Sequence, residues 1–189
     1  MPTPLGHSFM ALAVMGATPF VSPVNGAREK AWLAVYCVAV ANMADLDFIW
    51  WNGAGFTVSS IFHHGITHSL GFALIVAAVA YAVARLRGRK DCLQLAILTT
   101  ALYSSHVVVD LLNEDNYSQN GVGLPALWPL TETYFIFPII PGVNRDNLFT
   151  LGNAKAVMVE VLLFGGIMMA VWGYRFWRDR GVVRATARE

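Results

Sequence analysis

Charged residues are scarce in this sequence: they make up only 13% of its 189 residues, against roughly 25% in an average soluble domain. The formal net charge is +1, so no excess of basic residues predicts a nucleic-acid partner. Two cysteines are too few for a disulfide-stapled scaffold. Internal repeats are absent, which excludes a solenoid. Apolar residues are abundant instead, at 56% of the chain. This composition indicates an integral membrane protein.

Long apolar stretches support this prediction. A helix needs about 20 apolar residues to cross the hydrocarbon core of a bilayer. Four stretches have about this length: 31–51, 69–86, 92–112 and 154–177. A fifth, 9–24, is shorter and contains two prolines, so it either spans with a kink or is re-entrant. No Lys or Arg precedes it, so we do not expect a cleaved signal peptide. The expected fold is an all-α membrane bundle of about five transmembrane helices, forming one domain over residues 1–189.

Basic residues predict the orientation of this bundle. Of the 13 Lys and Arg, 11 lie in three regions: between the first and second stretches, from the end of the third to the start of the fourth, and from the end of the last stretch onward. Because cytoplasmic loops collect positive charge, we expect these three regions on the cytoplasmic side of a bacterial inner membrane. They include a basic tail over residues 177–189, which we expect to meet anionic lipid head groups. The N-terminus and residues 52–68 and 113–153 then face the extracytoplasmic side.

Histidine is rare, yet all five histidines fall on or near this outer face. Three of them lie in "FHHGITHSL", just before the third apolar stretch. Three aspartates, Asp45, Asp47 and Asp110, are predicted to lie at the same face of the membrane. Charge bias assigned the faces without reference to either residue type, so the clustering is independent evidence for a site. The candidate metal ligands are His7, Asp45, Asp47, His63, His68, His106 and Asp110, and His64 is a further site residue.

The spacing of these residues along the chain indicates which of them can act together. In "SHVVVD", His106 and Asp110 are four residues apart, which places both on one face of a helix. They either bind a metal together or form a single structural hydrogen bond, and ionisable groups inside membrane segments favour function. Asp45 and Asp47 are two apart. We therefore expect that one ligates and the other supports it, or that the helix ends near Asp45.

Imidazole and carboxylate ligands without thiolate suit zinc, with manganese or iron as alternatives. One zinc takes about four ligands, so this set predicts two zinc ions, or three. Two metals can activate a water molecule and bind the oxygens of a phosphate ester. Whichever of Asp45 and Asp47 is free of metal could serve as the general base. The two cysteines, Cys37 and Cys92, lie at different depths, so we expect packing roles and no disulfide.

The order of these motifs resembles the YdjM-like family of LexA-regulated, inner-membrane metal-dependent hydrolases. The resemblance covers residues 7 to 130: an early histidine, "ADLD", "HHGITHSL", "SHVVVD" and "GVGLPALWPL". Two positions depart from the family pattern, because Ala44 stands where proline is usual and His64 where arginine is usual. The resemblance implies that His63 and His68 bind metal and that His64 faces the substrate.

A more distant resemblance is to zinc-dependent phospholipase C and the P1-type nucleases, which bind zinc through a similar order of His, Asp, His and a helical HxxxD. It implies phosphoester hydrolysis. The later ligands of those enzymes have no clear counterpart here, and Glu114, Asp115 and Glu132 are stand-ins. Residues 113–143 are too short and too polar at the start to span. We expect them to cover the site, either as a substrate-admitting lid or as an interfacial anchor.

The sequence therefore predicts a membrane-bound metal-dependent hydrolase of a phosphoester, in a lipid or lipid-linked substrate, with membrane lipids as its surroundings. One alternative is a metal transporter, which should also place polar groups at the bilayer midplane. Only Asn42 and Glu160 lie there, and we expect them to bond to each other. The other alternative is a haem protein that pairs His7 or His68 with His106. The surplus of aspartates argues against haem, which needs no carboxylate ligand.

Overall fold

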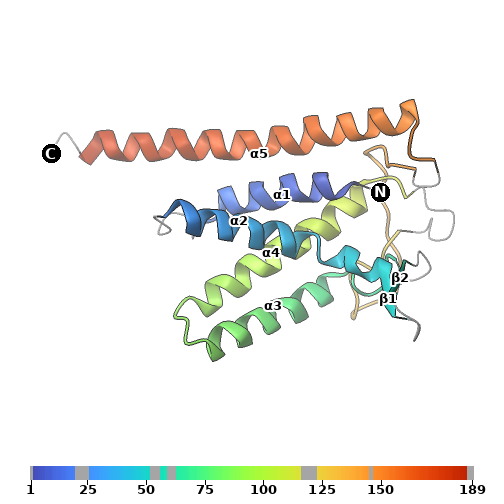
Figure 1. Ribbon diagram of the computed structural model, residues 1–189, viewed down its shortest axis with the longest axis horizontal. Helices are drawn as coiled ribbons and strands as arrows, with labels where there is room; N and C mark the ends of the chain where they lie inside the picture. Colours follow the sequence, from blue (N-terminus) through green and yellow to red (C-terminus); the bar gives the residue numbers. More distant parts are fainter. Residues whose placement is uncertain are drawn as a thin grey trace.

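The computed structural model describes residues 2–19, 26–51, 56–58, 63–115, 123–144 and 147–186. Five α-helices dominate these residues, and consecutive helices run in opposite directions (Figure 1). The all-α expectation is therefore confirmed, apart from one two-stranded hairpin. The helices are α1 (Pro4–Ala17), α2 (Ala27–Ala41), α3 (Leu70–Leu86), α4 (Cys92–Leu112) and α5 (Leu151–Thr186).

Two of these helices are long and apolar enough to cross a bilayer, namely α4 and residues Leu151–Arg180 of α5. Helices α1 and α3 are apolar but shorter, so a fold with five full spans stays a prediction. The bounds of α4 agree with the predicted stretch. Helix α3 begins one residue later than predicted, because Ser69 is its N-cap and its hydroxyl accepts a hydrogen bond from the Phe72 N–H at 3.1 Å.

The predicted span 31–51 is wrong in its second half. Helix α2 ends at Ala41 and is followed by a 3-10 helix, η2 (Ala44–Phe48), and the antiparallel strands β1 (Ile49–Trp51) and β2 (Phe56–Val58). The Asn42 side chain donates to the Val38 carbonyl at 2.8 Å. The Asn42 N–H donates to the same carbonyl at 3.1 Å, and asparagine, whose side chain bonds locally to the backbone, is unfavourable inside a helix. The predicted stretch 9–24 is also shorter as a helix, and its residues 20–24 lie outside the described residues.

Helix α5 packs against α1, along one side of the molecule (Figure 1). Trp172 donates from its indole to the Leu12 carbonyl at 3.0 Å, and Glu160 accepts hydrogen bonds from Thr3. The predicted pair of Asn42 and Glu160 is therefore wrong. The absence of a disulfide is confirmed, since both cysteines are free and buried.

Residues 123–144 lie across the end of the bundle where α3 begins and α4 ends. The Leu70 N–H donates to the Ala126 carbonyl at 2.9 Å, and the Phe137 N–H donates to the Leu111 carbonyl at 2.7 Å. Gly71 allows this close crossing, because a Cβ there would lie 2.2 Å from the Trp128 carbonyl oxygen. Leu130 is 89% exposed. This segment covers the site end of the bundle with an apolar surface.

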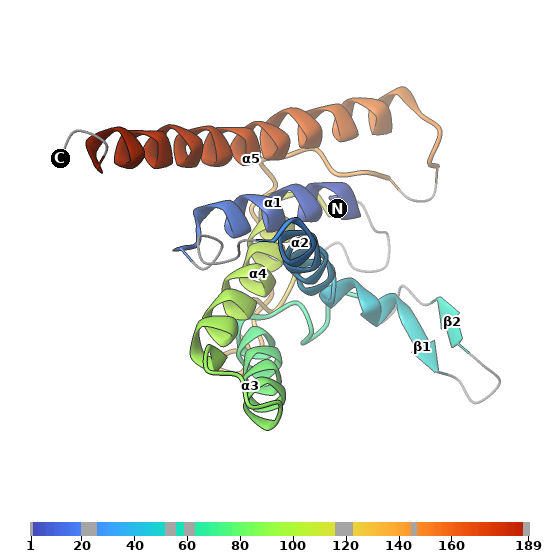
Figure 2. The ribbon, with the colours of Figure 1, turned by 60° about the vertical axis from the view of Figure 1, so that its left-hand side comes forward.

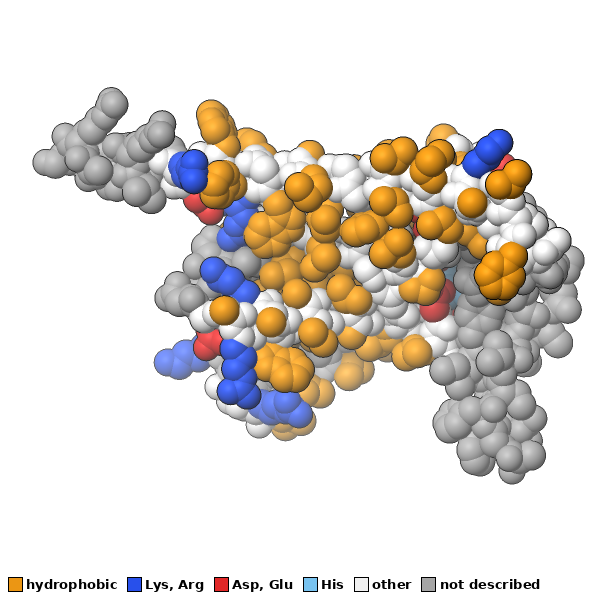
Figure 3. Space-filling model, turned by 45° about the horizontal axis from the view of Figure 1, so that its top comes forward, with side chains coloured by type: hydrophobic (Ala, Val, Ile, Leu, Met, Phe, Trp, Pro, Cys, Tyr) orange, Lys and Arg blue, Asp and Glu red, His pale blue; other side chains and the backbone are white. Residues whose placement is uncertain are grey.

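Hydrophobic side chains spread over the helices on the face shown in Figure 3, and most of the Lys and Arg side chains in that view gather at one end. That end holds the start of α2, the connection between α3 and α4, and the C-terminal part of α5 (Figure 1). The regions predicted to face the cytoplasm thus share one end of the bundle. The histidines lie at the other end.

Candidate metal centre

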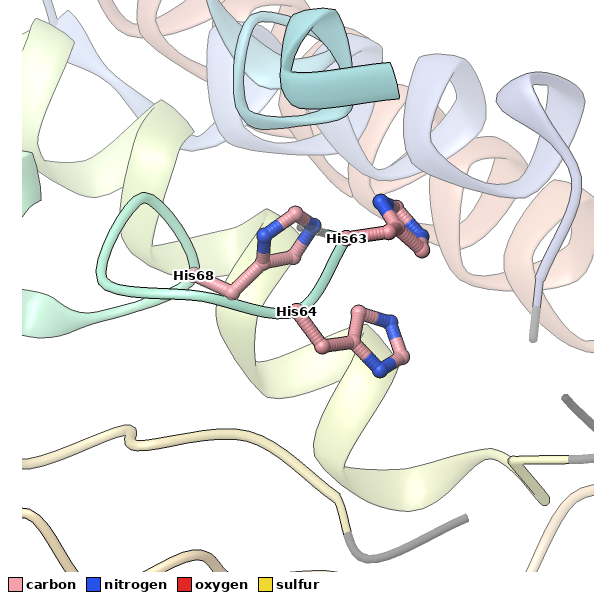
Figure 4. Close-up of side chains that lie close together, drawn as sticks. All are labelled: His63, His64 and His68. Carbon is pink, nitrogen blue, oxygen red and sulfur yellow. The ribbon is translucent and has the colours of Figure 1, made fainter. Parts of the chain in front are cut away.

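All five histidines are buried at one end of the bundle, and none is more than 2% exposed. His7 comes from the second turn of α1, and His106 from the C-terminal half of α4. The loop before α3 supplies the other three, whose rings project to the same side of the loop above α4 (Figure 4). Imidazoles that are buried this deeply cannot rely on bulk water as a partner. Each ring carries polar nitrogens that need hydrogen bonds or another ligand.

His106 shows most directly what the cluster is suited to bind. Its Nδ1 lies 2.7 Å from the Ala41 carbonyl oxygen, which can only accept a hydrogen bond, so Nδ1 carries the proton. In the neutral ring, Nε2 then carries a lone pair. This atom is 2.9 Å from Oδ2 of Asp110, one helical turn away. A lone pair and a carboxylate oxygen repel each other at that distance unless a proton or a metal cation lies between them. A proton or a metal cation therefore lies between these two atoms.

Asp47 orients two further imidazoles. Its Oδ1 accepts from His63 Nδ1 at 2.7 Å, and its Oδ2 lies 3.1 Å from His68 Nδ1. Oδ2 also accepts from the Thr67 hydroxyl at 2.8 Å. The Tyr103 hydroxyl in turn donates to the Thr67 carbonyl at 2.8 Å. A carboxylate on the far nitrogen of a histidine is the usual arrangement around bound metals. Asp47 therefore lies behind the imidazoles.

Asp45 and Asp110 instead face the Nε2 atoms. Oδ1 of Asp45 lies 3.6 Å from Nε2 of both His68 and His106. Oδ1 of Asp110 lies 3.6 Å from His7 Nε2, and its Oδ2 lies 3.7 Å from His68 Nε2. Neither Asp110 oxygen accepts a hydrogen bond from the described residues. Buried carboxylates without such bonds cost several kcal/mol each, and a bound cation would remove that cost.

These contacts shift the pKa values of Asp47, His63 and His68. Burial opposes the charged form of Asp47, but hydrogen bonds from His63 and His68 outweigh it and hold the pKa of this carboxyl well below its usual range. Burial lowers the pKa of His63 to about 4, despite its bond to Asp47. Burial also opposes the charged form of His68, yet Asp45 and Asp47 together raise its pKa to about 9.

Three groups of side chains bring their ligand atoms within 4.8 Å of one another. The groups are His63, His64 and His68; His7, Asp45 and His106; and His68, His106 and Asp110. The first two groups share no residue, and the third links them. The structure thus brings together six of the seven predicted ligands, and His64 with them. Asp47 belongs to none of the three groups, which cover the described residues alone.

The family comparison agrees with this geometry. A model of the YdjM inner membrane protein family matches residues 1–181. The chain belongs to this family. No curated protein and no solved structure matches the chain. The YdjM family match spans every residue of the His and Asp cluster, so the resemblance drawn from the motifs is confirmed.

Sequence patterns do not reveal every residue that contributes to this site in the YdjM family chain. The Ala41 carbonyl carries no sequence signal, since every residue has one. Thr67 and Tyr103 support Asp47 through contacts that cross from the loop to α4. Asp115 was considered only as a stand-in for a missing ligand, and its Oδ2 lies 3.5 Å from Nδ1 of His64. His64 itself has a φ of +63°, which is uncommon for a residue with a side chain.

Proposed function

We propose that this YdjM family member is a membrane-bound metal-dependent hydrolase that cleaves a phosphoester in a lipid or lipid-linked substrate. The observation that carries the proposal is the contact between His106 and Asp110, where Nε2 lies 2.9 Å from a buried carboxylate oxygen while Nδ1 is bonded to the Ala41 carbonyl. Together with the imidazoles and the carboxylate around it, this pair has the composition of a catalytic metal site rather than of a structural hydrogen bond.

Two ions fit the ligand groups best. One set is His7, Asp45 and His106, and a separate set is His63, His64 and His68. Asp110 lies between the sets, because its two oxygens face His7 on one side and His68 and His106 on the other. We propose that Asp110 would contribute to both sets when divalent cations are bound, with zinc the best match to nitrogen and oxygen ligands. Manganese and iron are the alternatives. In this assignment His64 is a ligand and does not face the substrate.

The chain's own residues supply the remaining chemistry. Bound metal makes water a nucleophile near neutral pH and neutralises charge on phosphoryl oxygens. The Asp45 side chain is 16% exposed, against 7% for Asp47 and 0% for Asp110. Asp45 is therefore the carboxylate of its ligand set that water and substrate can reach. Asp47 keeps His63 and His68 oriented. The basic end of the bundle favours an extracytoplasmic site and a cytoplasmic C-terminus.

The two alternatives have less support. A transporter needs binding groups near the midplane, whereas this cluster is confined to one end of the bundle. Haem ligands point their nitrogens at the iron from opposite faces of the porphyrin. The rings of His7 and His106 are instead stacked, with centroids 3.8 Å apart, which leaves no room for a porphyrin between them.

Metal analysis and a hydrolysis assay test the proposal. The chain is purified in detergent, its metal content and absorbance spectrum are measured, and hydrolysis of bis(4-nitrophenyl) phosphate is followed. We expect two metal ions per chain, no haem absorbance, and an activity that is lost with a chelator and restored by zinc or manganese. Ser105→Ala, next to His106 but outside the cluster, is the matched control for His106→Ala. Metal binding without hydrolysis of any phosphoester would reject the enzyme function.

A further inference from the structure

A long groove runs between α2 and α3. Both helices pack against α4, which lies between them in Figure 2, and side chains of all three helices line the groove. Its volume is about 1500 Å³, which exceeds the roughly 300–1,000 Å³ of most small-molecule pockets. On α3 it is lined by two rows of side chains four residues apart. One row is Phe72, Val76, Ala80 and Ala84, and the other is Ile75, Val79 and Val83. The groove therefore follows the whole length of α3.

The groove has an apolar middle and two polar ends. Apolar residues of all three helices line the middle. Arg87 and Arg89 lie at the basic end of the bundle. Asp47 and Thr67 lie at the other end, and Asp47 is the residue that bonds to His63 and His68. The groove therefore ends beside the candidate metal centre, on the Asp47 side of the imidazoles.

Its length suits an extended hydrocarbon chain. The 17 residues of α3 rise by about 26 Å at 1.5 Å per residue. An extended chain advances roughly 1.25 Å per carbon, from tetrahedral angles and C–C bonds near 1.5 Å, so the groove has room for about 20 carbons. Ile75 and Val79 on its rim are 46% and 57% exposed, so the groove opens sideways rather than toward the bundle interior.

We propose that this groove binds the acyl chain of a membrane phospholipid and so holds the phosphoester of that lipid at the metal centre. Cleavage of the lipid rests on the proposed function, whereas binding of the chain does not. The order of chemical groups along the groove carries the proposal: a polar end beside the candidate metal centre, then an apolar path as long as an acyl chain, open on the side that a bilayer would cover. A helix of another protein would not need a groove that ends beside the metal centre.

A single bulky side chain tests this proposal. Ala80 lies ten residues after the start of α3, about 15 Å along the helix, and it lines the groove. Ala80→Trp should therefore stop chains longer than about 12 carbons. Ala78 is exposed and does not line the groove, so Ala78→Trp is the matched control. Native mass spectrometry in detergent measures the binding of lysophosphatidylglycerol with chains of 8 and 16 carbons.

We expect Ala80→Trp to weaken binding of the 16-carbon lipid at least tenfold while the 8-carbon lipid binds as before. Ala78→Trp should match the unmodified chain. Equal effects of the two variants, or equal effects on both chain lengths, would overturn the proposal. So would tighter binding of a polyprenyl phosphate than of the acyl lipid, or a lipid-free dimer in which a second chain fills the groove. The same series in His106→Ala separates the two proposals, because chain-length-dependent binding there upholds the groove even if no phosphoester is hydrolysed.

Discussion

Ala41 and His106 are joined by a hydrogen bond between two helices, with 2.7 Å from the His106 Nδ1 to the Ala41 carbonyl oxygen. Ala41 is the last residue of α2, and carbonyls in the last turn of a helix lack partners within that helix. The bond satisfies this carbonyl and fixes the protonated nitrogen of the imidazole. The end of α2 therefore decides which nitrogen of His106 is left for a cation.

Removing either member of the HxxxD pair should remove metal. His106→Ala should lose the ion of its ligand set, and Asp110→Ala should lower the occupancy of both sets because this carboxylate lies between them. Metal content per chain measures the effect, with Ser105→Ala as control. A thermal melt with and without added zinc checks that each variant folds. Full metal occupancy in both variants would mean that the pair is a structural hydrogen bond.

Asp47→Asn should weaken metal binding without abolishing it. The amide keeps the size of the side chain but accepts fewer hydrogen bonds, so His63 and His68 lose the fixed orientation that Asp47 gives them. Loss of such a supporting group costs about 10–100-fold in metal affinity. Competition with a chelator of known affinity measures the change. A loss as complete as that in Asp110→Ala would show that Asp47 is itself a ligand.

Glu160 holds the start of α1, and with it His7. Its carboxylate accepts from the Thr3 N–H at 3.0 Å and from the Thr3 hydroxyl at 2.6 Å. Hydrogen bonds to a charged group contribute about 1.5–3 kcal/mol each, so Glu160→Gln should lower the melting temperature and weaken metal binding together. Glu132→Gln, at an exposed position, is the control. Unchanged metal affinity in a destabilised Glu160→Gln chain would limit this glutamate to a folding role.

Part of this site follows from sequence because its spacing is local. His106 and Asp110 are one turn apart on any helix, and α4 has the predicted bounds. The same holds for the crowded histidines, which come directly before the N-cap of α3 at Ser69. The uneven distribution of Lys and Arg predicts that these segments lie at one face of the membrane. The structure brings their side chains into one cluster.

Other features, such as the end of α2 and the partner of Glu160, could not be predicted from local sequence patterns. Residues 49–51, Ile-Trp-Trp, are apolar and fit a helix or a strand equally well by hydropathy, so the end of α2 at Ala41 was missed. Their β-branched and aromatic character is the signal that favours a strand. Glu160 was paired with the wrong residue because its partner, Thr3, is 157 positions away and meets it only through the packing of α5 on α1.

Metal binding should release a proton from His68. Its pKa of about 9 means that His68 is protonated at pH 7 in the metal-free chain, and an imidazolium cannot bind metal. Affinity should therefore rise with pH up to about 9, by about tenfold per unit from this group. His63, with a pKa of about 4, is neutral at pH 7 and releases none. Calorimetry in two buffers of different ionisation enthalpy counts the protons, and His63→Ala should leave this release in place.

The side of the membrane that the site faces can be tested with reporters. Arg28 lies in the first turn of α2, at the basic end of the bundle. This end also contains the α3–α4 connection and the C-terminal part of α5 (Figure 1). This end should stay in the cytoplasm, because 11 of the 13 basic residues belong to its regions. A C-terminal green fluorescent protein should therefore fluoresce. Alkaline phosphatase inserted at Asn120, outside the described residues, should be active. An inactive enzyme at Asn120, with a dark C-terminal reporter, would place the metal centre at the cytoplasmic face, where a lipid substrate would have to come from the inner leaflet.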